Sequence, residues 1–331
     1  MINISTLILL LVILGAAVAG ALVYRSWRAG RRAEAAVPPR GAFVQISTGR
    51  LHYLDCGTGP AIVLVHTLDG NLGHFDCGLI DELARNHRVV AIDRPGSGYS
   101  ERPAGTATNV RAQARLLAEA IEVLELESPL LVGHSMGGSI ALALALEKPD
   151  LICGLALLAP LTLPIPEVPD VFSDYESDTD FRRKLRSWTT GIPHRVKHSG
   201  VVLKQFFGPE QMPSNFLTTG GGLLSLRPSA MIQASRDFAT VQDDLPGMAR
   251  DYARLQVPVR ILFGQNDRVL DPELHGHKLV NRHPQIGLEL TPGGHMLPVT
   301  QPDICVEFVA RAAEAFKGRR LVSRASPEVY R

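Results

Sequence analysis

The stretch LLVGHSMGG, residues 130–138, decides the fold of this chain. An apolar run leads into a Gly-x-Ser-x-Gly turn, and an alanine- and leucine-rich segment from Ser139 to Glu147 follows at once. This order predicts a strand, a sharp turn and a helix. A serine in such a turn needs small residues two places before and after it, because side chains there would clash with the tight backbone. We expect the Ser135 hydroxyl at a sheet edge, beside the positive end of the helix.

Apolar runs on both sides of this stretch predict a mostly parallel, doubly wound α/β sheet. Strands that are apolar throughout are typical of sheets covered by helices on both faces. Residues with helical spacing separate these runs and predict the covering helices. The expected strands are residues 61–66, 88–92, 130–134, 154–158, 259–263 and 287–290, preceded by a hairpin at 43–47 and 51–56.

The alternation of strand and helix patterns is interrupted between residues 161 and 245, where prolines cluster at 164, 166 and 169. This segment predicts an inserted helical cap. The core then consists of a first part at 41–160 and a second part at 246–317, and a basic tail follows at 318–331. The cap carries apolar side chains that either pack it onto the core or line a pocket: Leu161, Leu163, Ile165, Val168, Phe172, Trp188, Phe206, Phe207, Phe216, Leu223 and Leu224.

The N-terminus differs from the rest of the chain. Residues 7–23 contain no charged side chain, and arginines follow at 25, 28, 31 and 32. A run of this length is near the lower limit for crossing a bilayer, and positive charges favour the cytoplasmic side. We expect a transmembrane signal anchor at 1–24, a short linker at 25–40 and a single-pass protein with a cytoplasmic catalytic domain. A cleaved signal peptide, suggested by Ala17-Val18-Ala19, and a buried core helix are the alternatives.

Charge and cysteine usage exclude several functions. The chain has 34 basic and 33 acidic residues, so overall charge gives no case for a nucleic-acid partner. Four scattered cysteines show neither metal-ligand spacing nor a disulfide framework, and His194 and His198 lack a third ligand. We therefore predict no metal and no cofactor. The oligomeric state stays open.

Four further motifs appear in a fixed order along the chain. They are a strand ending at His66, DRPGSGYS at 93–100, FGQND at 263–267 and GGHM at 293–296. Together with the serine turn they resemble the α/β-hydrolase fold family across residues 41–317. In that family the catalytic residues follow the order serine, acid, histidine, and Ser135, Asp267 and His295 obey it.

The resemblance assigns a role to each of these residues. Ser135 is the expected nucleophile, His295 the general base and acid, and Asp267 the residue that orients His295. The Met136 N–H is one expected oxyanion donor. The second follows a His-Gly pair in the family; here the pair is His66-Thr67, which makes Leu68 the expected donor.

The same motifs also give structural roles to two other residues. We expect His66 to bond its own loop and Asp93 to hold its turn, without a part in the chemistry.

We therefore predict a membrane-anchored serine hydrolase that cleaves the ester of a lipophilic small molecule through an acyl-enzyme. Dehalogenases and epoxide hydrolases of this fold use an aspartate nucleophile, so Ser135 argues against both. Two alternatives stay open. One is a carbon–carbon bond hydrolase of the meta-cleavage type, which uses the same triad. The other is a catalytically silent binding protein on the same scaffold.

Overall fold

In the computed structural model, which describes residues 3–167, 169–177 and 179–318, one sheet of eight strands forms the centre of the protein. The strand order is β1-β2-β4-β3-β5-β6-β7-β8. β1 and β2 are antiparallel to their neighbours, and all other pairs are parallel. The strands are β1 (Ala42–Ile46), β2 (Gly49–Cys56), β3 (Ala61–Val65), β4 (Arg88–Ile92), β5 (Leu130–His134), β6 (Gly154–Leu158), β7 (Val259–Gly264) and β8 (Ile286–Thr291).

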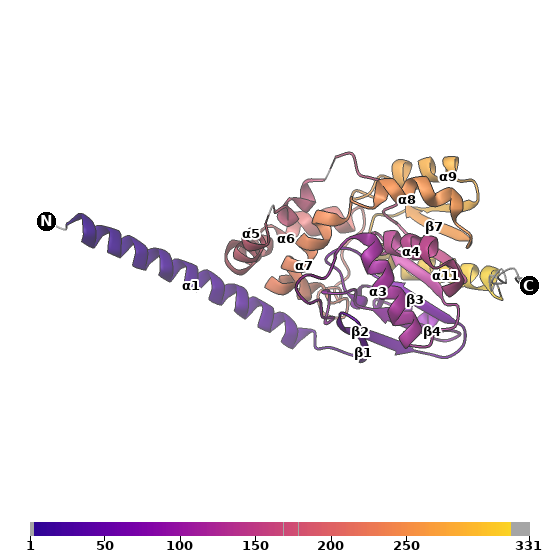
Figure 1. Ribbon diagram of the computed structural model, residues 1–331, viewed down its shortest axis with the longest axis horizontal. Coiled ribbons are helices and arrows are strands. Elements are labelled where there is room, and N and C mark those ends of the chain that lie inside the picture. The colour runs from indigo at the N-terminus through magenta and orange to yellow at the C-terminus, as the bar shows by residue number, and fades with distance from the viewer. Residues whose placement is uncertain (1–2, 168, 178, 319–331) are drawn as a thin grey trace, which may run out of the picture.

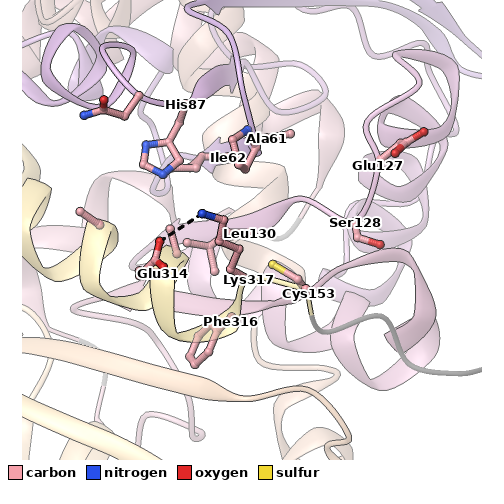
Figure 2. Close-up of a pocket in the computed structure, with 15 residues that line it drawn as sticks. Ala61, Ile62, His87, Glu127, Ser128, Leu130, Cys153, Glu314, Phe316 and Lys317 are labelled. Carbon is pink, nitrogen blue, oxygen red and sulfur yellow. Dashed lines mark ion pairs between the residues drawn. The ribbon is translucent and has the colours of Figure 1, made fainter.

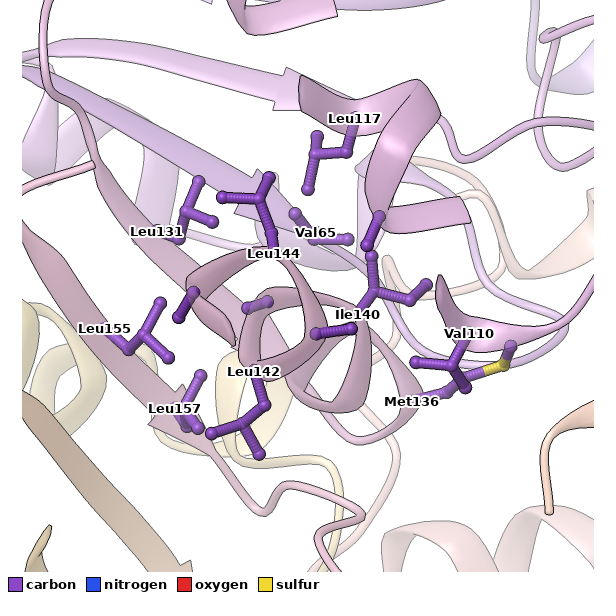
Figure 3. Close-up of a cluster of buried hydrophobic side chains, with 14 of the residues drawn as sticks. Val65, Val110, Leu117, Leu131, Met136, Ile140, Leu142, Leu144, Leu155 and Leu157 are labelled. Atoms are coloured by element: carbon purple, nitrogen blue, oxygen red, sulfur yellow. The ribbon is translucent and has the colours of Figure 1, made fainter. Parts of the chain in front are cut away.

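Helices cover both faces of this sheet. Successive strand residues point to opposite faces. Val63 and Val65 therefore pack with α3 (Val110–Val123) and α4 (Met136–Glu147), while Ile62 and Leu64 pack with α2 (Leu79–Leu83) and α11 (Pro302–Phe316). Figure 3 shows Val65 near Leu117 of α3 and Leu144 of α4. This confirms the predicted fold class. The core helices are α2 (Leu79–Leu83), α3 (Val110–Val123), α4 (Met136–Glu147), α8 (Leu245–Asp251), α9 (Lys278–Arg282), α10 (Leu297–Thr300) and α11 (Pro302–Phe316), with short 3-10 or π turns η1 (Leu72–Phe75), η2 (Pro149–Leu151), η6 (Tyr252–Arg254) and η7 (Glu273–His277).

The chain between β6 and α8 forms a helical cap over the carboxyl ends of the strands, as expected. Its longer helices are α5 (Asp180–Arg186), α6 (Ile192–Phe207) and α7 (Pro228–Thr240), joined by η3 (Asp170–Tyr175), η4 (Ser187–Gly191) and η5 (Gly222–Leu226). The domain boundaries drawn from the sequence stay predictions. Of the expected tail at 318–331, only Gly318 is among the described residues.

The first helix, α1 (Ile4–Ala36), is 33 residues long and apolar enough in its first part to cross a membrane. Residues 25–36, expected to belong to a linker, instead continue the helix. The buried residues Ser26, Gly30 and Ala33 lie on one face of α1, which packs against the cap. They are small, and a Cβ on Gly30 would lie 3.4 Å from the Pro228 ring. Figure 1 shows the rest of α1 projecting away from the globular part.

Candidate active site

The serine turn lies between β5 and α4, where the sequence predicted it. Ser135 has φ +55° and ψ −118°, a backbone conformation that residues other than glycine rarely adopt. A Cβ on Gly137 would lie 2.1 Å from the Val65 carbonyl oxygen, and one on Gly133 would lie 2.5 Å from the Gly137 carbonyl oxygen. Only glycine fits at both positions, which confirms the steric argument made from the sequence.

Asp267 and His295, 28 residues apart, meet beyond the ends of β7 and β8. His295 Nδ1 donates to Asp267 Oδ2 at 2.7 Å, and both side chains are buried. The other Asp267 oxygen accepts the N–H groups of Val269 at 2.8 Å and Leu270 at 2.9 Å. With the proton on Nδ1, Nε2 of a neutral His295 is an acceptor. Nε2 is buried and has no hydrogen-bond partner among the described residues, Ser135 included.

Close backbone contact brings these two loops together. The Asn266 N–H donates to the Gly293 carbonyl at 2.8 Å, and the Gln265 N–H donates to the Thr291 carbonyl at 2.9 Å. A Cβ on Gly264 would lie 2.3 Å from the Gly294 carbonyl oxygen. The glycine is therefore required for the loop of Asp267 to approach the loop of His295.

His134, the residue before the serine, connects the turn to His295. Its Nε2 donates to the His295 carbonyl at 2.9 Å, and the two rings lie 5.1 Å apart. Burial lowers the pKa of His134 well below its usual value, so the ring stays neutral. The structure thus brings the segments of Ser135, Asp267 and His295 to one place.

Both expected oxyanion donors lie at this place in the backbone. Met136 is the first residue of α4, where an N–H has no acceptor within the helix. Leu68 lies in the turn after β3 that the Gly70 N–H closes by donating to the Thr67 carbonyl at 3.2 Å. Within the described residues no backbone acceptor pairs with the Leu68 N–H. Their roles as oxyanion donors stay predictions.

His66 and Asp93 have the structural roles expected of them. His66 Nδ1 donates to the Thr67 carbonyl at 2.8 Å, and its Nε2 accepts the Arg94 N–H at 2.9 Å. Asp93 accepts the N–H groups of Leu72 at 2.7 Å and Tyr99 at 2.9 Å, and it bonds the His52 ring at 2.7 Å.

No pattern in the sequence predicted the structural role of Arg94. Its guanidinium donates to the carbonyls of His66 and Thr67, each at 3.1 Å, and to Asp237 of α7 at 2.8 Å. It therefore ties the loop of Leu68 to the cap. An arginine inside the motif DRPGSGYS was visible, but its distant partner was not.

A cavity of about 250 Å³ lies between this loop and the cap. It reaches Leu68 and Met296, the neighbour of His295, although Ser135 and His295 are not in its lining. Most of the lining is apolar: Leu68, Val171, Phe172, Val196, Val202, Leu203, Phe206, Phe207, Phe216, Leu217, Leu223, Leu226 and Met296.

The apolar cap residues singled out in the sequence are either cavity lining, buried in packing, or exposed. Phe172, Phe206, Phe207, Phe216 and Leu223 line the cavity. Leu161 and Leu163 belong to the core, Ile165 packs against it, and Leu224 is buried. Trp188 is exposed. Val168 lies outside the described residues.

Polar side chains occupy one part of the cavity wall. Asp69 Oδ2 accepts the Tyr175 hydroxyl at 2.8 Å and Arg195 Nη1 at 2.7 Å. Burial raises the pKa of Asp69, while Arg195 and Tyr175 act in the opposite direction. His74 also lines the cavity; burial lowers its pKa to about 4, and its buried Nδ1 has no partner in the described part of the chain.

A second, larger cavity of about 640 Å³ lies at the opposite edge of the sheet (Figure 2). Ala61, Leu130 and Cys153 line it at the amino ends of β3, β5 and β6, and α11 closes it with Phe316 and the Glu314–Lys317 ion pair. Because the serine turn is at the carboxyl ends of the strands, this cavity takes no part in the site.

Comparison with known proteins places these features in a wider group. The model of the alpha/beta hydrolase family matches residues 62–308. Haloalkane dehalogenase 2 of Mycobacterium tuberculosis is 39% identical over 113 residues, which cover 34% of this chain and 38% of that protein. The 2-hydroxymuconate semialdehyde hydrolase of a Pseudomonas species is 36% identical over 141 residues, which cover 41% of this chain and 50% of that protein. The matches thus span half or less of these relatives.

Among solved structures, a bacterial membrane phospholipase A has the same fold. It superposes with a TM-score of 0.69 at 20% sequence identity, and the alignment covers 96% of this chain and 100% of that chain.

Proposed function

Because this chain belongs to the alpha/beta hydrolase family, we propose that it is a serine hydrolase that cleaves a carboxylic ester through an acyl-enzyme. One observation carries the proposal. The 2.7 Å bond from His295 Nδ1 to Asp267 fixes the tautomer in which buried Nε2 accepts a proton, at the serine turn. A silent binding protein has no need of this arrangement.

In the proposed first half-reaction, Ser135 Oγ bonds to the carbonyl carbon of the ester while its proton passes to His295 Nε2. The carbonyl oxygen becomes an oxyanion, held by the N–H groups of Met136 and Leu68. His295 then gives the proton to the alkoxide oxygen as the carbon–oxygen bond breaks. An alcohol leaves, and the acyl group stays on Ser135.

The second half-reaction repeats these steps with water. A water molecule attacks the acyl carbon and gives a proton to His295 Nε2, which returns it to Ser135 Oγ as the ester bond of the acyl-enzyme breaks. The carboxylic acid leaves. Asp267 stays ionised and stabilises the imidazolium that forms in each half.

The main alternative is carbon–carbon bond hydrolysis of the meta-cleavage type. The relative named 2-hydroxymuconate semialdehyde hydrolase favours it, although the match spans half of that protein. The match to the dehalogenase is no reason to propose dehalogenation by this chain. Dehalogenases of this fold need an aspartate where this chain has Ser135.

Covalent labelling tests the nucleophile. A fluorophosphonate should label the protein, and Ser135→Ala should abolish both the label and ester hydrolysis. Ser128→Ala is the matched control, since Ser128 lines the cavity at the far edge of the sheet and should leave labelling intact. A folded wild-type protein that takes no label would favour the silent scaffold.

We further propose a lipophilic substrate, on the strength of the apolar cavity. Each buried methylene adds at most about 0.8 kcal/mol of binding. The specificity constant should therefore rise along p-nitrophenyl acetate, butyrate and octanoate until the cavity is full. A constant that falls steadily from acetate onward would point to a small polar ester, and turnover of a meta-cleavage dienoate in preference to all of these would favour the alternative.

We also propose that residues 7–23 anchor the protein in a membrane, with the catalytic domain in the cytoplasm. The apolar first part of α1 and the arginines at 25, 28, 31 and 32 support this orientation.

A further inference from the structure

Apolar side chains gather on the outside of the cap. Beyond α1, nine large apolar side chains of the described residues are exposed, and five of them lie within residues 181–201. We call these five the cap face: Phe181, Leu185, Trp188, Val196 and Val201. Phe181 is 74% exposed and Val201 is 71% exposed. Isolated exposed apolar residues are ordinary, but five of them within the consecutive elements α5, η4 and α6 indicate an interaction.

The position of α1 places the cap face near the proposed membrane. Ser26 Oγ donates to the carbonyl of Thr189 in η4, between α5 and α6, at 3.5 Å. Ser26 is three residues beyond Val23, the last apolar residue of the proposed span, and therefore about 4.5 Å further along the helix axis. Figure 1 shows α5 and α6 on the side of the globular part that faces the projecting half of α1.

Charge on this part of the protein suits an anionic surface. Residues 180–204 contain seven lysines and arginines and one acidic residue, Asp180. Two of the seven, Arg183 and Arg195, are buried and pair with Asp180 and Asp69. Lys197 and Lys204 are exposed on α6, and Arg25 and Arg28 are exposed on α1. Basic side chains next to apolar ones are typical of segments that lie in the interface of an anionic bilayer.

From these observations we propose that the cap face docks on the anionic bilayer that α1 enters, so that the protein is held at two points. This inference rests on the proposed anchor. It also deepens the proposed function, because Val196 belongs both to the cap face and to the lining of the cavity near the serine turn. Ser199, Val202 and Leu203 of α6 continue that lining. A lipophilic ester can then pass from the bilayer into the cavity along α6.

The two tryptophans of the chain, Trp27 and Trp188, allow a direct test. The full-length protein is reconstituted into vesicles of phosphatidylcholine and phosphatidylglycerol that contain brominated lipid, which quenches tryptophan fluorescence on contact. Trp27→Phe leaves Trp188 as the reporter of the cap face, and Trp188→Phe leaves Trp27 as the reporter of α1. We expect quenching of both.

The outcomes separate the two proposals. Quenching of Trp27 without quenching of Trp188 would overturn the docking of the cap face and leave the anchor in place. Absence of quenching in both variants would overturn the anchor and the docking together.

A second experiment measures the consequence for activity. Phe181→Ser, Leu185→Ser and Val201→Ser are combined, since none of the three lines the cavity. Hydrolysis of a long-chain ester dissolved in vesicles should fall several-fold, while hydrolysis of p-nitrophenyl butyrate in solution stays unchanged. Val123→Ser with Ile304→Ser, two exposed apolar positions outside the cap, is the matched control. Equal vesicle rates in the cap variant and this control would contradict the proposal.

Discussion

Asp267 is held more firmly than an aspartate in a surface loop would be. Two backbone N–H groups fix one of its oxygens, and His295 occupies the other. Its carboxylate therefore has a set orientation before any substrate binds. In the proposed reaction this orientation decides which nitrogen of His295 carries the proton.

Replacement of Asp267 by asparagine should lower kcat about 10,000-fold, because an amide permits the wrong tautomer of His295. KM should change little. Asp271→Asn is the matched control, since Asp271 is exposed and its carboxylate accepts the Glu273 N–H at 2.9 Å within the turn. Ester hydrolysis by the two purified variants gives kcat and KM for each. An equal loss of kcat in the two variants would contradict the role of Asp267.

The residues expected at the site from the sequence are those that lie in a short local motif. Ser135, Asp267 and His295 each follow a strand, so their positions along the chain carry the signal. His74 and Asp69 line the cavity next to them and were not predicted. Their positions depend on cap residues more than 100 places away, such as Tyr175 and Phe216, which no local pattern reveals.

At the scale of elements, one buried carboxylate joins the cap to the core. Asp237 of α7 accepts Arg94 at 2.8 Å and Arg102 at 2.5 Å, and all three side chains are almost completely buried. Arg94 also holds the loop of Leu68. The position of the cap and the backbone of the proposed oxyanion site are therefore connected.

Asp237→Asn should lower the free energy of unfolding by about 3–5 kcal/mol, because it leaves two buried guanidinium groups without a charged partner. Asp180→Asn removes a carboxylate that pairs with Arg183, Lys184 and Arg236 on the outer surface of the cap, where Asp180 is 46% exposed. It should cost about 1 kcal/mol or less. Urea unfolding compares the two. A similar small loss at both positions would show that Asp237 does not stabilise the junction.

Strands were predicted more reliably than the first helix was. Runs such as 130–134 and 154–158 are apolar throughout because helices cover both faces of the sheet, and this leaves a clear pattern. In α1 the apolar run ends before Arg25, and a linker was expected from there to residue 40. The spacing of the small residues Ser26, Gly30 and Ala33 is that of one helix face. It indicates a helix only once the cap is seen to pack on that face.

At the scale of the whole molecule, buried histidines make stability depend on pH. Burial lowers the pKa of His74 and of His275 to about 4, and it also lowers the pKa of His66 and of His134 well below the usual value of 6.5. Between pH 6.5 and pH 4 the unfolded chain binds protons that the folded protein does not. Stability is therefore complete above pH 6.5 and is lost as the pH falls.

The melting temperature should accordingly drop between pH 7 and pH 5. Each histidine contributes up to about 1.4 kcal/mol per pH unit within its window. His74→Phe removes one of these groups and keeps a ring against Phe216, whose centroid lies 5.3 Å away. Its melting temperature should drop less than that of the wild type over the same range. An equal or larger drop in the variant would contradict the burial of a neutral His74.

The proposed topology has its own test. The purified protein should keep its N-terminus, and a C-terminal alkaline phosphatase fusion should be inactive, because the proposed topology puts the C-terminus in the cytoplasm. Mass spectrometry of the purified protein shows whether the N-terminus is intact, and the phosphatase activity of the fusion shows on which side the C-terminus lies. A mature chain that begins near Gly20, or an active fusion, would instead favour a cleaved signal peptide or the opposite orientation.

The continuity of α1 has a mechanical consequence. Residues 25–36 are helical and packed on the cap, so no hinge separates the proposed span from the catalytic domain. The uncharged segment 7–23 is about 26 Å long, slightly less than the roughly 30 Å hydrocarbon core of a typical bilayer. A helix adjusts to membranes of different thickness by changing its tilt. Any such tilt would roll the entire catalytic domain with it, so the acyl-chain length of the host membrane would set the angle at which the enzyme meets its surface.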